Sequence, residues 1–157
     1  MTVQSTAATP PLTVPDQDLV RQLLDAMEIN HGVDGQGDLV ASWEGFNVFF
    51  LFSGEEQEVF SMRGFHSESY PLDRRGEVVA TADDWNRDTL WPKAFTHDYE
   101  GSVQFVTEAQ TIIGTGVGTD HFVVSFAAWL QGTLQFREWI ATRLDAAGSG
   151  PGAEAGG

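Results

Sequence analysis

Three strand-like runs lie so close together in residues 38–65 that they can only pair as antiparallel neighbours. Residues 38–43 alternate apolar and polar side chains, residues 47–52 are apolar on both faces, and residues 58–65 carry apolar side chains on both faces too. The turns between them are a few residues long, whereas parallel strands need a crossover of about a dozen residues or more. The middle run is therefore expected to be a central, well-covered strand of an antiparallel sheet.

Three helices and two further strands are predicted around these runs. Helices are indicated where apolar residues recur at steps of three and four, and a hairpin where two strand-like runs flank Glu100 and Gly101. The first helix is expected to start near Pro15, with Thr13 and Asp16 resembling a capping box, and to end at residues 30–32. The other predicted segments are helices 71–90 and 119–144 and strands 93–99 and 102–113. This order, α-β-β-β-α-β-β-α, predicts an α+β fold with a five-stranded antiparallel sheet packed by helices.

The two ends of the chain are too poor in apolar side chains to pack. Residues 1–13 are rich in Thr, Ala, Ser and Pro, and residues 145–157 in Gly and Ala. Such segments cannot offset the entropy lost on ordering. They are predicted to be disordered tails on either side of one domain, residues 14–144.

Composition excludes several classes of function. The chain has no cysteine, so thiolate metal sites, thiol nucleophiles and disulfides are ruled out. Its formal net charge of −15 repels nucleic acid and anionic membranes, and no apolar run approaches the ~20 residues of a membrane span. We therefore expect a cytoplasmic protein that binds neither nucleic acid nor membrane.

Motifs that resemble ligand sites lack essential parts. The glycine-rich segment 113–119 has no lysine for a Walker loop, and Thr119 stands where a dinucleotide fingerprint needs its third glycine; we expect Thr119 to cap the last helix. The turn at residues 34–38 lacks the glutamate of a calcium loop, since Gly45 is at the twelfth position. The four histidines show no metal-site spacing. No cofactor and no metal are expected.

Glu108 leaves two interpretations open. It shares a strand face with Gln104, Val106 and Gln110. It is either an exposed sheet carboxylate or one paired with Lys93 or Arg87.

One stretch of the chain resembles a known family. Residues 84–87, Asp-Trp-Asn-Arg, lead into Trp-Pro-Lys-Ala at residues 91–94, and with Met62–Gly64 and Glu108 they are similar to the YbjN family, bacterial proteins described as sensory-transduction regulators. The resemblance spans roughly residues 16–143. It implies a fold like that of type III secretion chaperones, commonly dimeric, and no catalytic residues. In the pair Trp85 and Asn86 we expect a structural role, with Asn86 at a helix end.

These observations predict a non-catalytic regulatory or chaperone-like module that binds a protein partner, with a homodimer expected. The alternative is a small-ligand-binding protein or an enzyme with a site on the sheet near Glu108 and His97. The last helix is apolar over about half its circumference, which is wider than packing on one sheet requires. Trp139 lies outside that arc beside Ala128 and Gly132, and Trp91 precedes a strand. These four residues are candidate interface residues. Equally, Trp139 could fold over Gly132 or pack on the first helix within its own chain.

Overall fold

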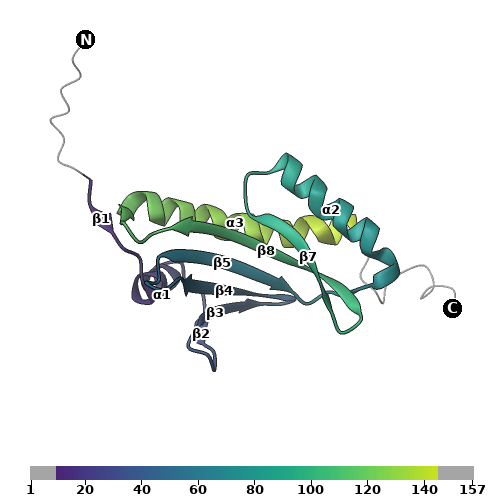
Figure 1. Ribbon diagram of the computed structural model, residues 1–157, viewed down its shortest axis with the longest axis horizontal. Helices are drawn as coiled ribbons and strands as arrows, with labels where there is room; N and C mark the ends of the chain where they lie inside the picture. Colours follow the sequence, from purple (N-terminus) through teal and green to yellow (C-terminus); the bar gives the residue numbers. More distant parts are fainter. Residues whose placement is uncertain (1–9, 145–157) are drawn as a thin grey trace, which may run out of the picture.

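The computed structural model describes residues 10–144, which form an α+β fold with helices packed on an antiparallel sheet (Figure 1). The elements are β1 (Leu12–Thr13), α1 (Gln17–Ala26), β2 (His31–Val33), β3 (Leu39–Trp43), β4 (Phe46–Ser53), β5 (Val59–His66), β6 (Tyr70–Pro71), a 3₁₀ turn (Leu72–Arg74), α2 (Arg75–Asp88), β7 (Lys93–Tyr99), β8 (Ser102–Ile112), β9 (Val117–Gly118) and α3 (Thr119–Arg143). The predicted class is confirmed.

The main sheet has seven strands in the described part of the chain, so the prediction of five was wrong. Its order is β2-β3-β4-β5-β8-β6, with β7 paired to β8, and all pairings are antiparallel. The eleven-residue β8 is long enough to pair with β5, β6 and β7. The two additional strands, β2 and β6, have three and two residues, too few to show an alternating pattern. β2 occupies the segment predicted to end the first helix.

A second, two-stranded sheet joins the start of the described chain to the start of α3. Leu12 and Thr13 form β1, which pairs antiparallel with β9. The carbonyl of Pro11 accepts hydrogen bonds from the Thr119 backbone N–H (3.1 Å) and from its hydroxyl (3.3 Å). The predicted tail boundary at residue 13 therefore falls inside an element. The remainder of the predicted tails, residues 1–9 and 145–157, lies outside the described residues.

The predicted helix caps differ from those observed. Asp16 itself caps α1, accepting a hydrogen bond from the Leu19 N–H at 2.9 Å, while Thr13 belongs to β1. Gly118 precedes α3, and Thr119 is bound by Pro11 rather than acting as the cap. In the loop before α3, Gly116 has a φ of +88°, a conformation that favours glycine. At Gly116, at least, the glycine-rich segment meets a need of the backbone.

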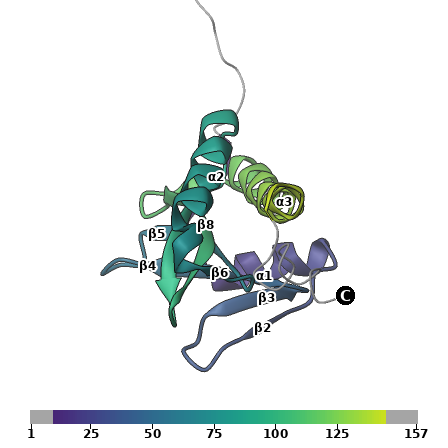
Figure 2. The same cartoon turned by 90° about the vertical axis from the view of Figure 1, so that its right-hand side faces the viewer.

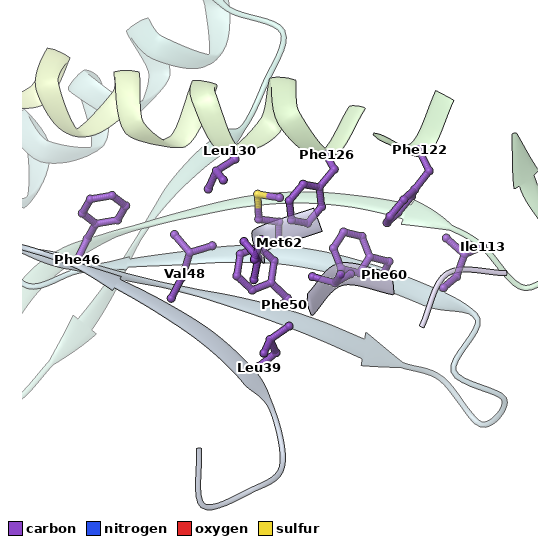
Figure 3. Packing of buried hydrophobic residues seen from close by; sticks show 13 residues of the cluster. Leu39, Phe46, Val48, Phe50, Phe60, Met62, Ile113, Phe122, Phe126 and Leu130 are labelled. Atoms are coloured by element: carbon purple, nitrogen blue, oxygen red, sulfur yellow. The ribbon is translucent and has the colours of Figure 1, made fainter. Parts of the chain in front are cut away.

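All three helices pack on the same face of the main sheet. Figure 2 shows α2 and α3 lying side by side over it. One buried cluster joins α1 and the first half of α3 to β3, β4 and β5, with Phe60 against both Phe122 and Phe126 (Figure 3). A second cluster joins the last part of α3 to α2 and β8, with Phe136 against Trp85 and Phe105.

The wide apolar arc of α3 follows from these two clusters. Phe122, Phe126 and Leu130 face the first cluster, and Phe136 and Ile140 face the second. A helix that packs on a sheet and on a neighbouring helix needs a broader apolar surface than one that packs on a sheet alone. Most of the arc is therefore accounted for by packing within one chain, although Val123 on the same helix is 37% exposed.

Candidate functional site: the open face of the sheet

None of the described helices packs on the opposite face of the main sheet, although Ser61, Val106 and Glu108 near its centre are buried. Side chains alternate along a strand, so the strand register assigns each residue to one face. We call the side without helices the open face. Its members are Gly32 on β2, Val40 and Ser42 on β3, Asn47, Phe49, Leu51 and Ser53 on β4, Val59, Ser61, Arg63 and Phe65 on β5, Pro71 on β6, Lys93, Phe95, His97 and Tyr99 on β7, and Ser102, Gln104, Val106, Glu108, Gln110 and Ile112 on β8.

Aromatic side chains run across the open face from β4 to β7. The rings of Phe49 and Phe65 meet edge to face at 5.6 Å, Phe65 lies 6.1 Å from His97, and His97 stacks on Tyr99 at 6.3 Å. Phe95 is 39% exposed and Tyr99 52% exposed. Exposed aromatic surface of this kind is characteristic of interaction sites.

A buried carboxylate lies between two cations near the middle of the open face. Arg63 Nε donates to Glu108 Oε2 at 2.5 Å, and its Nη2 forms an ion pair with the same oxygen. Lys93 Nζ lies 3.1 Å from Glu108 Oε1. The Glu108 side chain is 5% exposed, against 36% for Arg63 and 57% for Lys93. Burying the carboxylate is tolerable because both its oxygens are paired with cations.

This cluster settles the two interpretations of Glu108. The interpretation of Glu108 as an exposed carboxylate was wrong, and the interpretation that pairs it with Lys93 is confirmed. Arg87 is not a partner, because it binds Asp84 and Asp88 at the end of α2. The sequence reasoning missed Arg63, which lies directly opposite Glu108 in the pairing of β5 with β8.

His97 lies on the open face but away from Glu108. Glu108 pairs with Lys93, and His97 pairs with Gln104, four residues further along both strands. At about 3.3 Å per residue, roughly 13 Å of strand separates the two positions. The predicted alternative site near Glu108 and His97 therefore does not form a convergent pair, and both Glu108 oxygens are already bound.

Two of the segments that carried the family resemblance, residues 84–87 and 91–94, join α2 to β7. The Asn86 side chain accepts from the Ala94 N–H at 2.8 Å and donates to the Ala94 carbonyl at 2.9 Å. The Trp85 Nε1–H donates to the Pro92 carbonyl at 2.8 Å. Trp85 is buried, as its place in the apolar stripe indicated. The role is structural, as expected, but Asn86 acts by pairing with the strand backbone rather than by capping its helix.

Three of the four candidate interface residues lie together beside α3. Trp91, Ala128 and Gly132 line a shallow hollow of about 330 Å³. Leu90, at its edge, is 86% exposed. A side chain at Gly132 would stand 2.9 Å from the Trp91 carbonyl oxygen, so this glycine lets the Trp91–Pro92 segment approach the helix.

Trp139 lies elsewhere, over the second core cluster. Its ring is 5.4 Å from that of Trp85 and 6.1 Å from that of Phe136, and the Arg143 guanidinium lies over it at 4.7 Å. It is half-buried within its own chain. Its neighbours are on α2 and α3, rather than on the first helix or around Gly132.

The His66 side chain is buried in the core, and its pKa is lowered there. Its buried ring is parallel to Phe46 at 5.4 Å and meets Phe136 edge on at 5.1 Å. Burial, with a smaller contribution from the positive charge of Arg137, lowers the His66 pKa to about 4. The ring is therefore neutral at pH 7 and packs as a core residue.

Two further observations bear on chemistry. Within residues 10–144, no group of three or more His, Asp or Glu side chains is placed to hold a metal ion. None of the helices in that range is long and apolar enough to cross a membrane.

Comparisons with known proteins are consistent with the fold. The model of the YbjN family, described as "Putative bacterial sensory transduction regulator", matches residues 16–142. The crystal structure of YbjN from E. coli, described as "a putative transcription regulator", superposes with a TM-score of 0.64 and 18% sequence identity, covering 78% of this chain and 89% of that one. At that identity the structural likeness supports the fold alone. No curated protein matches the chain.

Proposed function

The chain belongs to the YbjN family, and from that premise we propose that it is a regulatory, chaperone-like module that binds a protein partner on its open face and has no catalytic chemistry. The observation that carries the proposal is the exposed aromatic surface of that face. Monomeric proteins seldom expose large contiguous apolar patches, and those that do usually bind something there.

The charged groups of the open face favour binding over catalysis. A general base needs a carboxylate free to take a proton from substrate. Both oxygens of Glu108 are bound by Arg63 and Lys93. The cluster therefore fits a fixed recognition feature better than a reacting one. A homodimer, expected from the sequence, would be one way of covering this face.

The proposal can be tested by comparing what variants capture from an extract of the native host. The test variant is Phe95→Ser with Tyr99→Ser, both on exposed positions of β7. Leu90→Ser alters the rival hollow beside Trp91, and Val124→Ser alters an exposed position on α3 away from both. Thermal melts would first show that each variant is folded.

We expect the wild type to enrich a defined set of proteins that the Phe95/Tyr99 variant alone fails to enrich. Loss of that set only in Leu90→Ser would move the binding surface to the hollow beside α3. Equal capture by all four proteins would refute binding on the open face.

A further inference from the structure

The open face differs in charge from the rest of the molecule. The whole chain carries a formal charge of −15. Among the strand positions of the open face, the only acidic residue is Glu108, which is matched by two cations, Arg63 and Lys93. In the same formal count, Arg63, Lys93 and Glu108 together give this face a charge of +1, whereas the whole chain is strongly acidic.

The two cations keep hydrogen-bonding capacity beyond their shared carboxylate. Arg63 and Lys93 are partly exposed while Glu108 is not. No other side chain or carbonyl among the described residues accepts a hydrogen bond from either cation. An arginine has five N–H donors and a lysine three, so donors remain for an incoming acceptor.

Aromatic side chains lie next to these cations, in the neighbouring row of the sheet that contains Phe95, Val106 and Phe65. Phe95 follows Lys93 by two residues on β7, and the Lys93 ammonium lies 5.9 Å from its ring centre. Phe65 follows Arg63 by two residues on β5 and contacts Phe49. A ligand that fits this surface would therefore place a negative group next to apolar side chains.

We propose that the open face binds a segment of a partner protein in which a carboxylate stands next to apolar side chains. The carboxylate binds the Arg63–Lys93 pair, and the apolar side chains lie on the neighbouring aromatic rings. The inference rests on the proposed function and specifies the chemistry of its partner. A second copy of this chain is the less favourable occupant, since self-docking would oppose two positive centres and two chains of charge −15.

The test uses two ten-residue fluorescent peptides, measured by anisotropy against the full chain. One alternates leucine or phenylalanine with glutamate, and the other has lysine in place of each glutamate. We expect the glutamate peptide to bind at least about tenfold more tightly than the lysine peptide. The Phe95→Ser/Tyr99→Ser variant should lose this binding, and Val124→Ser should keep it.

Two substitutions at the cluster should change affinity in opposite directions. Lys93→Gln removes the excess positive charge and should weaken binding of the glutamate peptide by about threefold. Glu108→Gln raises the net charge of the face to +2 and should tighten binding. A merely structural role for the cluster predicts weaker or unchanged binding for both variants. If Glu108→Gln does not fold, Lys93→Arg, which keeps the charge, should bind like wild type while Lys93→Gln does not.

Several results would overturn the inference. Equal binding of the two peptides would do so, as would a folded Glu108→Gln that binds no better than wild type. A dimer in light scattering that the Phe95/Tyr99 variant abolishes would identify a second copy as the occupant. If host proteins are still lost only from the Phe95/Tyr99 variant while neither peptide is preferred, this inference fails and the proposed function stands.

Discussion

Replacing Gly132 with alanine sets two opposing effects against each other, and the structure decides which is larger. Gly132 lies inside α3, where alanine favours the helix over glycine by about 0.8–1.0 kcal/mol. Its new Cβ, however, would lie 2.9 Å from the Trp91 carbonyl oxygen, 3.1 Å from Trp91 Cδ1 and 3.2 Å from Pro92 Cδ. The nearest of these atoms is backbone, which cannot turn away as a flexible side chain can.

Overpacking at such a site costs typically about 1–3 kcal/mol. The α2–β7 connection is held in place by the Trp85–Pro92 and Asn86–Ala94 hydrogen bonds, so it cannot retreat freely. Taking the helix preference into account, we expect Gly132→Ala to lower the free energy of unfolding by about 1 kcal/mol.

The matched control is Gly76→Ala in α2. A Cβ there meets no atom within 4 Å, so that substitution should raise the unfolding free energy by about 0.4–1 kcal/mol. Urea titrations of the two variants and the wild type measure both values. If Gly132→Ala stabilises the protein as much as Gly76→Ala, the close approach of Trp91 to α3 does not limit stability, and the reasoning is wrong.

Three further predictions concern α3, His66 and β1. In urea titrations Phe126→Ala should lower the free energy of unfolding by about 3–5 kcal/mol, and Val124→Ala, on the exposed side of α3, by less than about 0.5 kcal/mol. Similar losses of stability in the two variants would contradict the orientation of the helix. The free energy of unfolding should rise between about pH 4 and pH 6.5, because in that range His66 binds a proton in the unfolded chain but not in the folded one, where its pKa is lowered to about 4. The contribution of His66 to this rise approaches about 3 kcal/mol and should vanish in His66→Leu. An unchanged pH dependence in that variant would refute the prediction. A chain that starts at residue 14 should be about 1–2 kcal/mol less stable than one that starts at residue 10, since it lacks β1 and the Pro11 hydrogen bonds; identical thermal melts would count against a stabilising β1.

The long elements could be predicted because their patterns are local. Strands β3, β4, β5, β7 and β8 and helix α3 lie within a residue or two of the predicted ranges, since each repeats its apolar spacing over at least five residues. The short strands could not be predicted in this way. β1 and β6 exist because a strand distant in sequence offers them backbone hydrogen bonds, and β2 because the neighbouring β3 does. Two or three residues carry no detectable period.

The candidate site shows the same division. Lys93 was one of two possible partners suggested for Glu108, with Arg87 the other, and the structure shows that Lys93 and Glu108 face each other across one hairpin. Arg63 is 45 residues from Glu108, and α2 and β7 intervene. Nothing local indicates that β8 pairs with β5, so neither Arg63 nor the burial of Glu108 could be inferred. The packing of Trp139 on Trp85 depends in the same way on how α2 meets α3.

The pairing of β1 with β9 also has a consequence for the order in which the chain folds. The hydrogen bond between Pro11 and Thr119 spans 108 residues. Closing a loop of that length in an unfolded chain costs about 4 kcal/mol, more than two two-residue strands can return. The pair should therefore form only after α1 and α3 have docked on the sheet and brought it together. Substitutions in β1 should then leave the refolding rate almost unchanged and raise the unfolding rate. The contact between β1 and β9 would therefore slow unfolding without taking part in the folding nucleus.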